Sequence, residues 1–130
     1  MKKVQFHQFD PIIYPRKLWV GITNNCNTIR EQFNYEYENE LEDVIEKSTA
    51  FVFPCTHKES DKLGVCVIFL NRKNMDAKTI AHESVHIASQ IFSDCNMTMG
   101  FDDGKDEHFA YLVGWAADCI NQVKTGKFKD

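Results

Sequence analysis

The apolar run Val65–Leu70 is the feature that most limits how this chain folds. No polar residue interrupts it, which is typical of a strand with both faces buried. The run is far too short to span a membrane. The preceding stretch Ala50–Thr56 also favours a strand, and the polar residues 57–62 connect the two. We therefore expect a hairpin in which Ala50–Thr56 pairs with Gly64–Asn71.

A strand over Leu18–Ile22 and a helix from about Cys26 onward are predicted before this hairpin. Asn24 or Asn25 supplies the N-cap of that helix. Apolar residues then recur at helical spacing: Ile29, Phe33, Tyr37, Leu41 and Val44. Aromatic and acidic residues alternate directly after Asn34, as in a strand, so a break in the helix at this point stays open.

Two longer helices are predicted after the hairpin. Asn74 or Asp76 caps the first of them, which runs to about Ser93. Asp103 caps the second, which runs to about Lys124. The order is then strand, helix, strand, strand, helix, helix, and this order predicts an α+β fold over a single domain, residues 1–130.

Charge and composition exclude several classes of partner. The 130 residues are 43% hydrophobic, so a globular core is expected. The net charge of -4 and the pI of about 5.7 argue against a nucleic-acid surface, which needs clustered basic residues. The acidic run Glu36–Glu46 is interpreted as a solvated helix face, with an acidic docking surface as the alternative.

The cysteines and the N-terminus predict a soluble cytoplasmic protein without a membrane segment. The number of cysteines is five, an odd number, and no two of them form a C-x-x-C motif. This usage indicates a reducing compartment. The opening segment Met1–Gln8 carries positive charge but no apolar stretch follows it, so no signal peptide is predicted.

The sequence His82-Glu83-Ser84-Val85-His86 has the HExxH spacing of a zinc hydrolase helix. Residues four apart lie on one helix face, so both imidazoles can reach one metal ion. Glu83 is well placed to touch a water molecule at that ion. The pattern is short and also arises by chance in proteins without zinc. A metzincin is excluded, because Ser89 and Phe92 stand where that class has glycine and histidine.

A third metal ligand is expected from the helix that follows. Glu107 lies 21 residues after His86, as a gluzincin requires. Ala110 and Gly114 share a helical stripe with Glu107, and their small size predicts close packing of this stripe against the HExxH helix. Competing candidates for the third ligand are Asp102, Asp103, Asp106 and His108.

Two motifs together give about residues 63–118 a recognisable pattern: Ala81-His82-Glu83-x-x-His86 after an apolar strand, then Glu107-x-x-Ala110 on a following helix. This pattern resembles the small gluzincin-type metallopeptidases, such as the ImmA/IrrE-like group and related phage-encoded zincin-like proteins. The resemblance implies a minimal zincin-like domain, in which a small sheet carries an active-site HExxH helix and a glutamate helix follows.

The same resemblance implies the chemistry of the site. It implies a Zn2+ ion bound by His82, His86 and Glu107, with Glu83 as the general base in hydrolysis of a peptide or protein substrate. It also implies that the strand Gly64–Leu70 borders the cleft and pairs with an extended peptide.

The chain departs from the larger gluzincins at two places. Tyr111 stands where those enzymes have an aspartate; its hydroxyl could assist catalysis, and plain packing is the alternative. No later histidine follows, and His57 is the only loop histidine that could substitute. Two hypotheses of different class therefore remain. The first is a zinc-dependent metallopeptidase. The second is a non-catalytic zincin-fold module whose zinc is structural or vestigial and whose protein partner completes the cleft. A third possibility is a chain that binds no metal.

Overall fold

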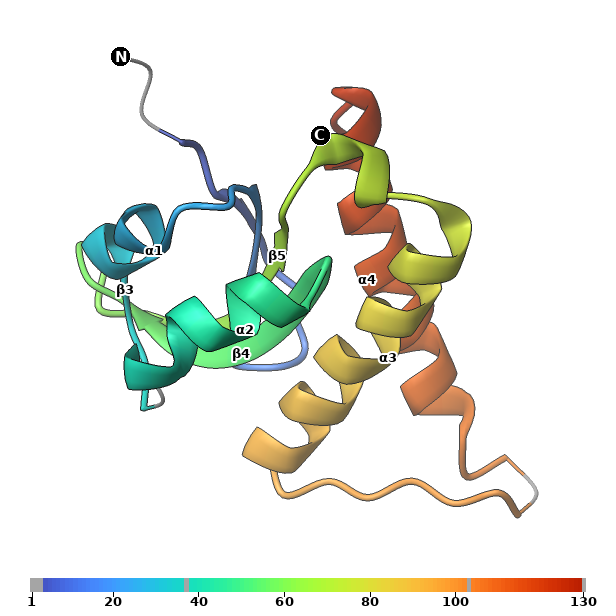
Figure 1. Cartoon of the computed structure of the whole chain (residues 1–130). Coiled ribbons are helices and arrows are strands. Elements are labelled where there is room, and N and C mark those ends of the chain that lie inside the picture. Colours follow the sequence, from blue (N-terminus) through green and yellow to red (C-terminus); the bar gives the residue numbers. More distant parts are fainter. Residues whose placement is uncertain (1–3, 37, 103, 130) are drawn as a thin grey trace.

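A mixed five-stranded β-sheet forms the centre of the computed structural model, which describes residues 4–36, 38–102 and 104–129 (Figure 1). The strands are β1 (His7–Phe9), β2 (Lys17–Ile22), β3 (Phe33–Asn34), β4 (Ala50–His57) and β5 (Leu63–Phe69). Their order across the sheet is β1-β2-β5-β4-β3, with β2 and β5 parallel and the other neighbours antiparallel. The helices are α1 (Cys26–Gln32), η1 (Glu38–Glu40), α2 (Leu41–Lys47), η2 (Arg72–Asn74), α3 (Ala77–Asp94) and α4 (Glu107–Thr125). The fold is therefore α+β, as expected.

The apolar run in β5 lies at the middle of the sheet, and the predicted hairpin with β4 is confirmed. Its side chains alternate between two cores. Val65, Val67 and Phe69 are completely buried on one face of the sheet, and Cys66 and Ile68 are completely buried on the other. This burial on both faces explains why the run has no polar position.

The expectation that β5 pairs with an extended peptide is wrong, because β5 is not an edge strand. Its backbone pairs with β2 on one side and with β4 on the other. The strand β4, by contrast, has an outer edge that is largely free. Its outer neighbour β3 reaches only Thr56 and His57, so within the described ranges no strand pairs with the outer edge of Ala50–Cys55.

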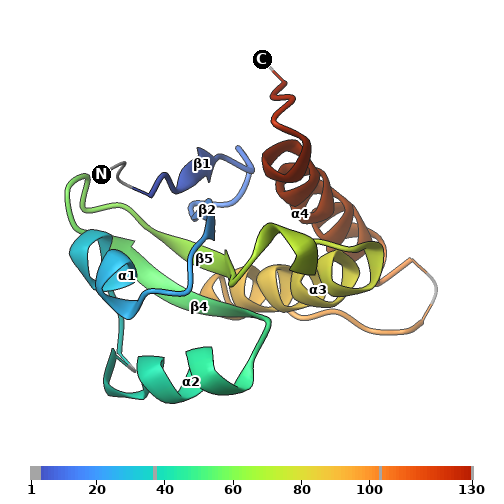
Figure 2. The same ribbon diagram turned by 45° about the horizontal axis from the view of Figure 1, so that its top comes forward.

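Helices cover both faces of the sheet (Figures 1 and 2). On one face, α3 and α4 lie side by side, and their buried residues join the core that contains Val65, Val67 and Phe69. On the other face, Ile29 of α1 and Leu41 of α2 join the second core. Among the described helices, none has the length and apolar character that a membrane crossing needs.

The first predicted helix is broken near Asn34, the alternative that the sequence left open. Asn25 caps α1, and its side chain accepts a hydrogen bond of 2.9 Å from the backbone N–H of Asn27. The chain leaves the helix at Phe33, which pairs with His57 in the sheet and is buried in the second core. Tyr37, which the helical spacing included, lies outside the described residues.

The HExxH helix α3 has the predicted position and cap. The Asp76 side chain accepts a hydrogen bond of 2.8 Å from the backbone N–H of Thr79. The helix buries one face against the sheet and α4, formed by Ile80, Glu83, Ser84, Ile87, Ala88, Ile91 and Phe92. His82 and His86 therefore lie on the flank of this buried face, beside the strand β4.

The last helix, α4, is rotated relative to the sequence-based expectation. Most of its buried face is apolar and consists of Leu112, Ala116, Cys119, Ile120 and Val123. Ala110 and Gly114 are exposed, so their expected packing against α3 is wrong. The predicted cap Asp103 lies outside the described residues. The helix ends at Gly126, which has the left-handed φ of 72° that glycine adopts readily.

Candidate functional site

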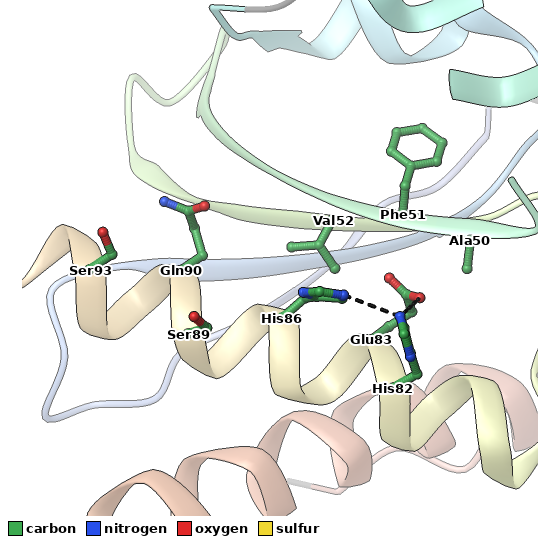
Figure 3. A pocket seen from close by; sticks show the side chains of 9 residues that line it. All are labelled: Ala50, Phe51, Val52, His82, Glu83, His86, Ser89, Gln90 and Ser93. Carbon is green, nitrogen blue, oxygen red and sulfur yellow. Dashed lines mark hydrogen bonds and ion pairs between the residues drawn. The ribbon is translucent and has the colours of Figure 1, made fainter. Parts of the chain in front are cut away.

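The HExxH residues line a hollow between α3 and the free edge of β4 (Figure 3). Figure 3 shows His82, Glu83 and His86 pointing from α3 toward the strand, with polar side chains following them along the helix. The hollow is lined by Ala50, Phe51, Val52, His82, Glu83, His86, Ser89, Gln90 and Ser93. The sequence thus predicted the three central residues, and the fold adds a strand edge opposite them.

The two histidines present converging nitrogen atoms. Nε2 of His86 lies 3.2 Å from Nε2 of His82, and the ring centroids are 4.8 Å apart. Two nitrogen ligands at about 2.0–2.1 Å from one tetrahedral zinc ion stand about 3.3–3.4 Å apart. The pair is therefore close to the spacing that a shared metal ion requires. Both residues are exposed on the hollow side, so an ion can reach them.

Glu83 is the buried member of the group. Its side chain is only 8% exposed, and its Oε2 lies 3.8 Å from Nε2 of His82. Within the described part of the chain, its carboxylate has no hydrogen-bond donor. Burial raises the pKa of the Glu83 carboxyl, and the neighbouring imidazoles of His82 and His86 act in the opposite direction. The Glu83 carboxylate therefore lies beside two imidazoles and lines the same hollow.

The free edge of β4 offers backbone hydrogen-bonding groups to this hollow. Leu70 N–H donates to the Thr49 carbonyl and His57 N–H donates to the Lys62 carbonyl, at 3.0 and 2.9 Å. In an antiparallel pair, alternate residues of a strand bond to the neighbouring strand, and these two bonds show that the odd-numbered residues of β4 bond to β5. The even-numbered residues Ala50 and Val52 therefore direct their N–H and C=O groups toward the outer edge. Pro54, which has no N–H, also faces outward, where a sheet tolerates proline.

Glu107 does not join the two histidines. It is exposed at the start of α4 and lines a different hollow, with Ala110, Tyr111, Gly114 and Trp115. The neighbouring Phe109 packs against Phe92, with ring centroids 5.3 Å apart. Phe92 lies six residues beyond His86 on α3, about 9 Å along the helix axis. The start of α4 is thus at the far end of α3 from the histidine pair.

The other sequence candidates also lie away from the pair. Asp102, Asp106 and His108 are exposed near the start of α4, and Asp103 lies outside the described residues. In the described ranges, no group of three or more His, Cys, Asp or Glu side chains is placed to hold a metal ion. The ligand set of His82, His86 and Glu107 therefore stays a sequence-based prediction. The structure brings together only the two histidines.

Tyr111 and His57 have no contact with the hollow of the HExxH residues. Tyr111 is 74% exposed as a residue and lines the same hollow as Glu107. His57 stands at the opposite end of β4 from Ala50, where its ring stacks on Trp19 at 5.4 Å between centroids. Its Nδ1 lies 2.9 Å from Oγ of Ser60. This geometry gives His57 a place in the packing of the hairpin.

The polar residues along α3 are the part of the site that the sequence reasoning missed. Ser89, Gln90 and Ser93 continue the line of His82 and His86 at helical spacing. That spacing was a usable signal, since a polar stripe beside a buried stripe indicates a groove or solvent. The strand edge had no comparable signal, because pairing between distant strands decides which edge stays free.

Comparison of the chain with protein-family models, with curated proteins and with solved structures finds no match.

Proposed function

We propose that this chain is a zinc-dependent metallopeptidase in which His82 and His86 bind the ion and Glu83 is the general base. One observation carries the proposal: two Nε2 atoms converge to 3.2 Å beside a buried carboxylate. This arrangement combines the ligand spacing of a tetrahedral ion with a proton acceptor next to it. We also propose that the region from α3 to α4 is part of a zincin-like domain, as the resemblance in sequence implies.

The residues fit a zinc ion only in part. The two imidazoles suit it in atom type and spacing. Glu107, at the start of α4, lies beside the C-terminal end of α3, too far from the histidine pair to be a third ligand in this arrangement. When bound, zinc would supply Lewis acidity toward a peptide carbonyl and a water molecule. In this proposal His82 and His86 are the protein ligands of the ion.

Glu83 performs the proton transfers in this proposal. Its carboxylate accepts the proton that a water molecule loses as the water oxygen attacks the peptide carbonyl carbon. The carboxyl group then donates that proton to the amine nitrogen as the C–N bond breaks. The substrate backbone lies along Ala50 and Val52, whose outward N–H and C=O groups can pair with an extended peptide. This strand edge takes the role that the sequence assigned to Gly64–Leu70.

A second candidate is a non-catalytic module that binds a peptide or protein partner through the same hollow. The observation in its favour is that the hollow contains His82, His86 and Glu83, yet among the described residues no three such side chains are placed to hold a metal ion together. Catalytic zinc sites normally have three protein ligands. The two candidates share the binding surface and differ in turnover.

The test compares the wild-type chain with His82→Ala and Glu83→Gln. We expect about one zinc per chain in the wild type and in Glu83→Gln, and little in His82→Ala, by mass spectrometry of protein purified without added metal. In a diverse peptide library, the wild type should cleave and Glu83→Gln should lose about 10²–10⁴ in rate, because glutamine cannot accept a proton.

Each result separates the candidates. Equal zinc in the wild type and His82→Ala would remove the metal site from the proposal. Zinc binding without cleavage of any library peptide would favour the non-catalytic module. Equal cleavage by the wild type and Glu83→Gln would show that Glu83 is not the base.

A further inference from the structure

A second hollow lies farther along the same edge of β4. Pro54, Cys55 and Thr56 form its strand side, and Arg16, Glu36 and Asp94 supply its charged groups. A hydrogen bond connects the two hollows, since Gln90 lines the first and donates to Asp94 in the second at 2.9 Å. The two hollows therefore form consecutive parts of one path along β4, with the C-terminal half of α3 beside it.

The separation of the two hollows corresponds to a few residues of extended peptide. Val52 lies opposite the histidine pair, and Pro54 borders the second hollow just before Asn34 pairs with Thr56. Two residues of β-strand span about 7 Å. A peptide that pairs with Ala50 and Val52 would consequently place its side chain about two positions away at the second hollow.

The charges of the second hollow favour a cation. Glu36 and Asp94 contribute two carboxylates against the single guanidinium of Arg16. The guanidinium and Asp94 form an ion pair, with Nε of Arg16 3.8 Å from Oδ2 of Asp94, and Nη1 of Arg16 donates to the Pro15 carbonyl at 2.8 Å. The charge in excess in this hollow is therefore the carboxylate of Glu36. The exposed Glu40 follows in the chain and adds to the negative field, whereas Oε1 of Glu38 pairs with Nε of Arg30 at 3.5 Å.

We propose that the second hollow binds a lysine or arginine side chain of an extended peptide whose backbone pairs with the free edge of β4. The inference rests on the proposed function for the position of the peptide and adds the substrate class, which is a basic polypeptide. It gives the acidic segment that begins at Glu36 a role in recognition beyond solvation. Because the hollow is partly open to solvent, the attraction weakens as salt screens the charges.

The experiment measures peptide binding to the Glu83→Gln variant by fluorescence anisotropy, with and without added zinc. Three peptides share one strand-forming sequence. They differ only at the two positions that lie two residues before and after the centre, where lysine, glutamine or glutamate stands. We expect the lysine peptide to bind about tenfold more tightly than the glutamine peptide, and the glutamate peptide to bind least. Added salt should reduce the preference for lysine.

Matched variants locate the preference. Glu36→Gln should reduce it, whereas Glu31→Gln, which removes the same charge from an exposed position on α1, should leave it unchanged. Tighter binding of the glutamate peptide would overturn the inference and indicate that Arg16 recognises an acid. A lysine preference that survives Glu36→Gln would also overturn it.

Zinc content is measured separately and tests only the proposed function. Zinc bound without any lysine preference would overturn the basic-substrate inference and leave the metal site standing. A lysine preference in a chain without zinc would support the inference and direct the proposed function toward the non-catalytic module.

Discussion

At the scale of single residues, Glu83 differs from its two neighbours in solvent exposure. His82 and His86 are exposed, with the His82 side chain at 66%, whereas the Glu83 side chain is at 8%. The helix places residue 83 about 100° from residue 82, on the side that turns toward the sheet. The imidazoles can therefore accept an ion from the hollow while the carboxylate stays shielded from bulk water. This difference in exposure is what the proposed roles require, with two accessible imidazoles as metal ligands and one shielded carboxylate as the base.

Glu107 provides the sharpest test of the ligand assignment. The sequence predicts that Glu107→Gln weakens zinc binding strongly, but its position at the far end of α3 predicts little effect. We expect Glu107→Gln to keep the zinc affinity of the wild type, and His86→Ala to lose most of it, in competition with a chelating dye. A strong loss in Glu107→Gln would restore Glu107 as the third ligand and contradict the arrangement of α4 described above.

At the scale of elements, α4 carries a glycine that its own packing does not require. A Cβ atom added at Gly114 would meet no atom within 4 Å, and the residue is exposed in the middle of the helix. Glycine in a helix interior is less favourable than alanine by about 0.8–1.0 kcal/mol, chiefly through backbone entropy. The close approach to α3 that the sequence suggested for this position is absent, because Leu112 and Ala116 form the contact face.

Gly114→Ala should therefore raise the free energy of unfolding by about 1 kcal/mol, measured by urea denaturation. The control is Gly126→Ala at the end of the same helix. Gly126 has a φ of 72°, so alanine there should lower the stability by about 1 kcal/mol or more. If Gly114→Ala is destabilising instead, the glycine makes a close contact and α4 lies closer to its neighbour than described here.

At the scale of the whole molecule, the helices on both faces of the sheet bury three of the five thiols. Cys55 and Cys66 lie in one core and Cys119 in the other, whereas Cys26 and Cys95 are partly exposed. Burial raises the pKa of Cys66 well above its usual value and raises the pKa of Cys119 to about 12. Thiolates are the reactive form, so the buried thiols should be inert in the folded chain.

Alkylation with iodoacetamide at about pH 8.5, near the usual thiol pKa, should label Cys26 and Cys95 in the folded chain and all five cysteines after unfolding. Peptide mass spectrometry reads the sites. Rapid labelling of Cys66 in the folded chain would contradict its complete burial. In the unfolded chain the thiols ionise at their usual pKa, so the folded chain, which disfavours the thiolates, should lose stability as the pH rises above that value.

The sequence by itself determined the features that depend on neighbouring residues. Asn25 and Asp76 cap helices through bonds to backbone groups two and three residues later. The apolar run of β5 indicated burial on both faces, and the HExxH spacing placed His82 and His86 on one helix face. These outcomes follow from local geometry, which has a fixed period in helices and strands.

Only the tertiary structure decided the features that join distant segments. The parallel pairing of β2 with β5 puts β5 at the centre of the sheet and leaves the outer edge of β4 free. The rotation of α4 follows from burial of its larger apolar residues, and this rotation turns Glu107 and Tyr111 toward solvent. The spacing of 21 residues between His86 and Glu107 cannot carry this information. The burial of side chains from several elements, rather than distance along the chain, decides which faces meet.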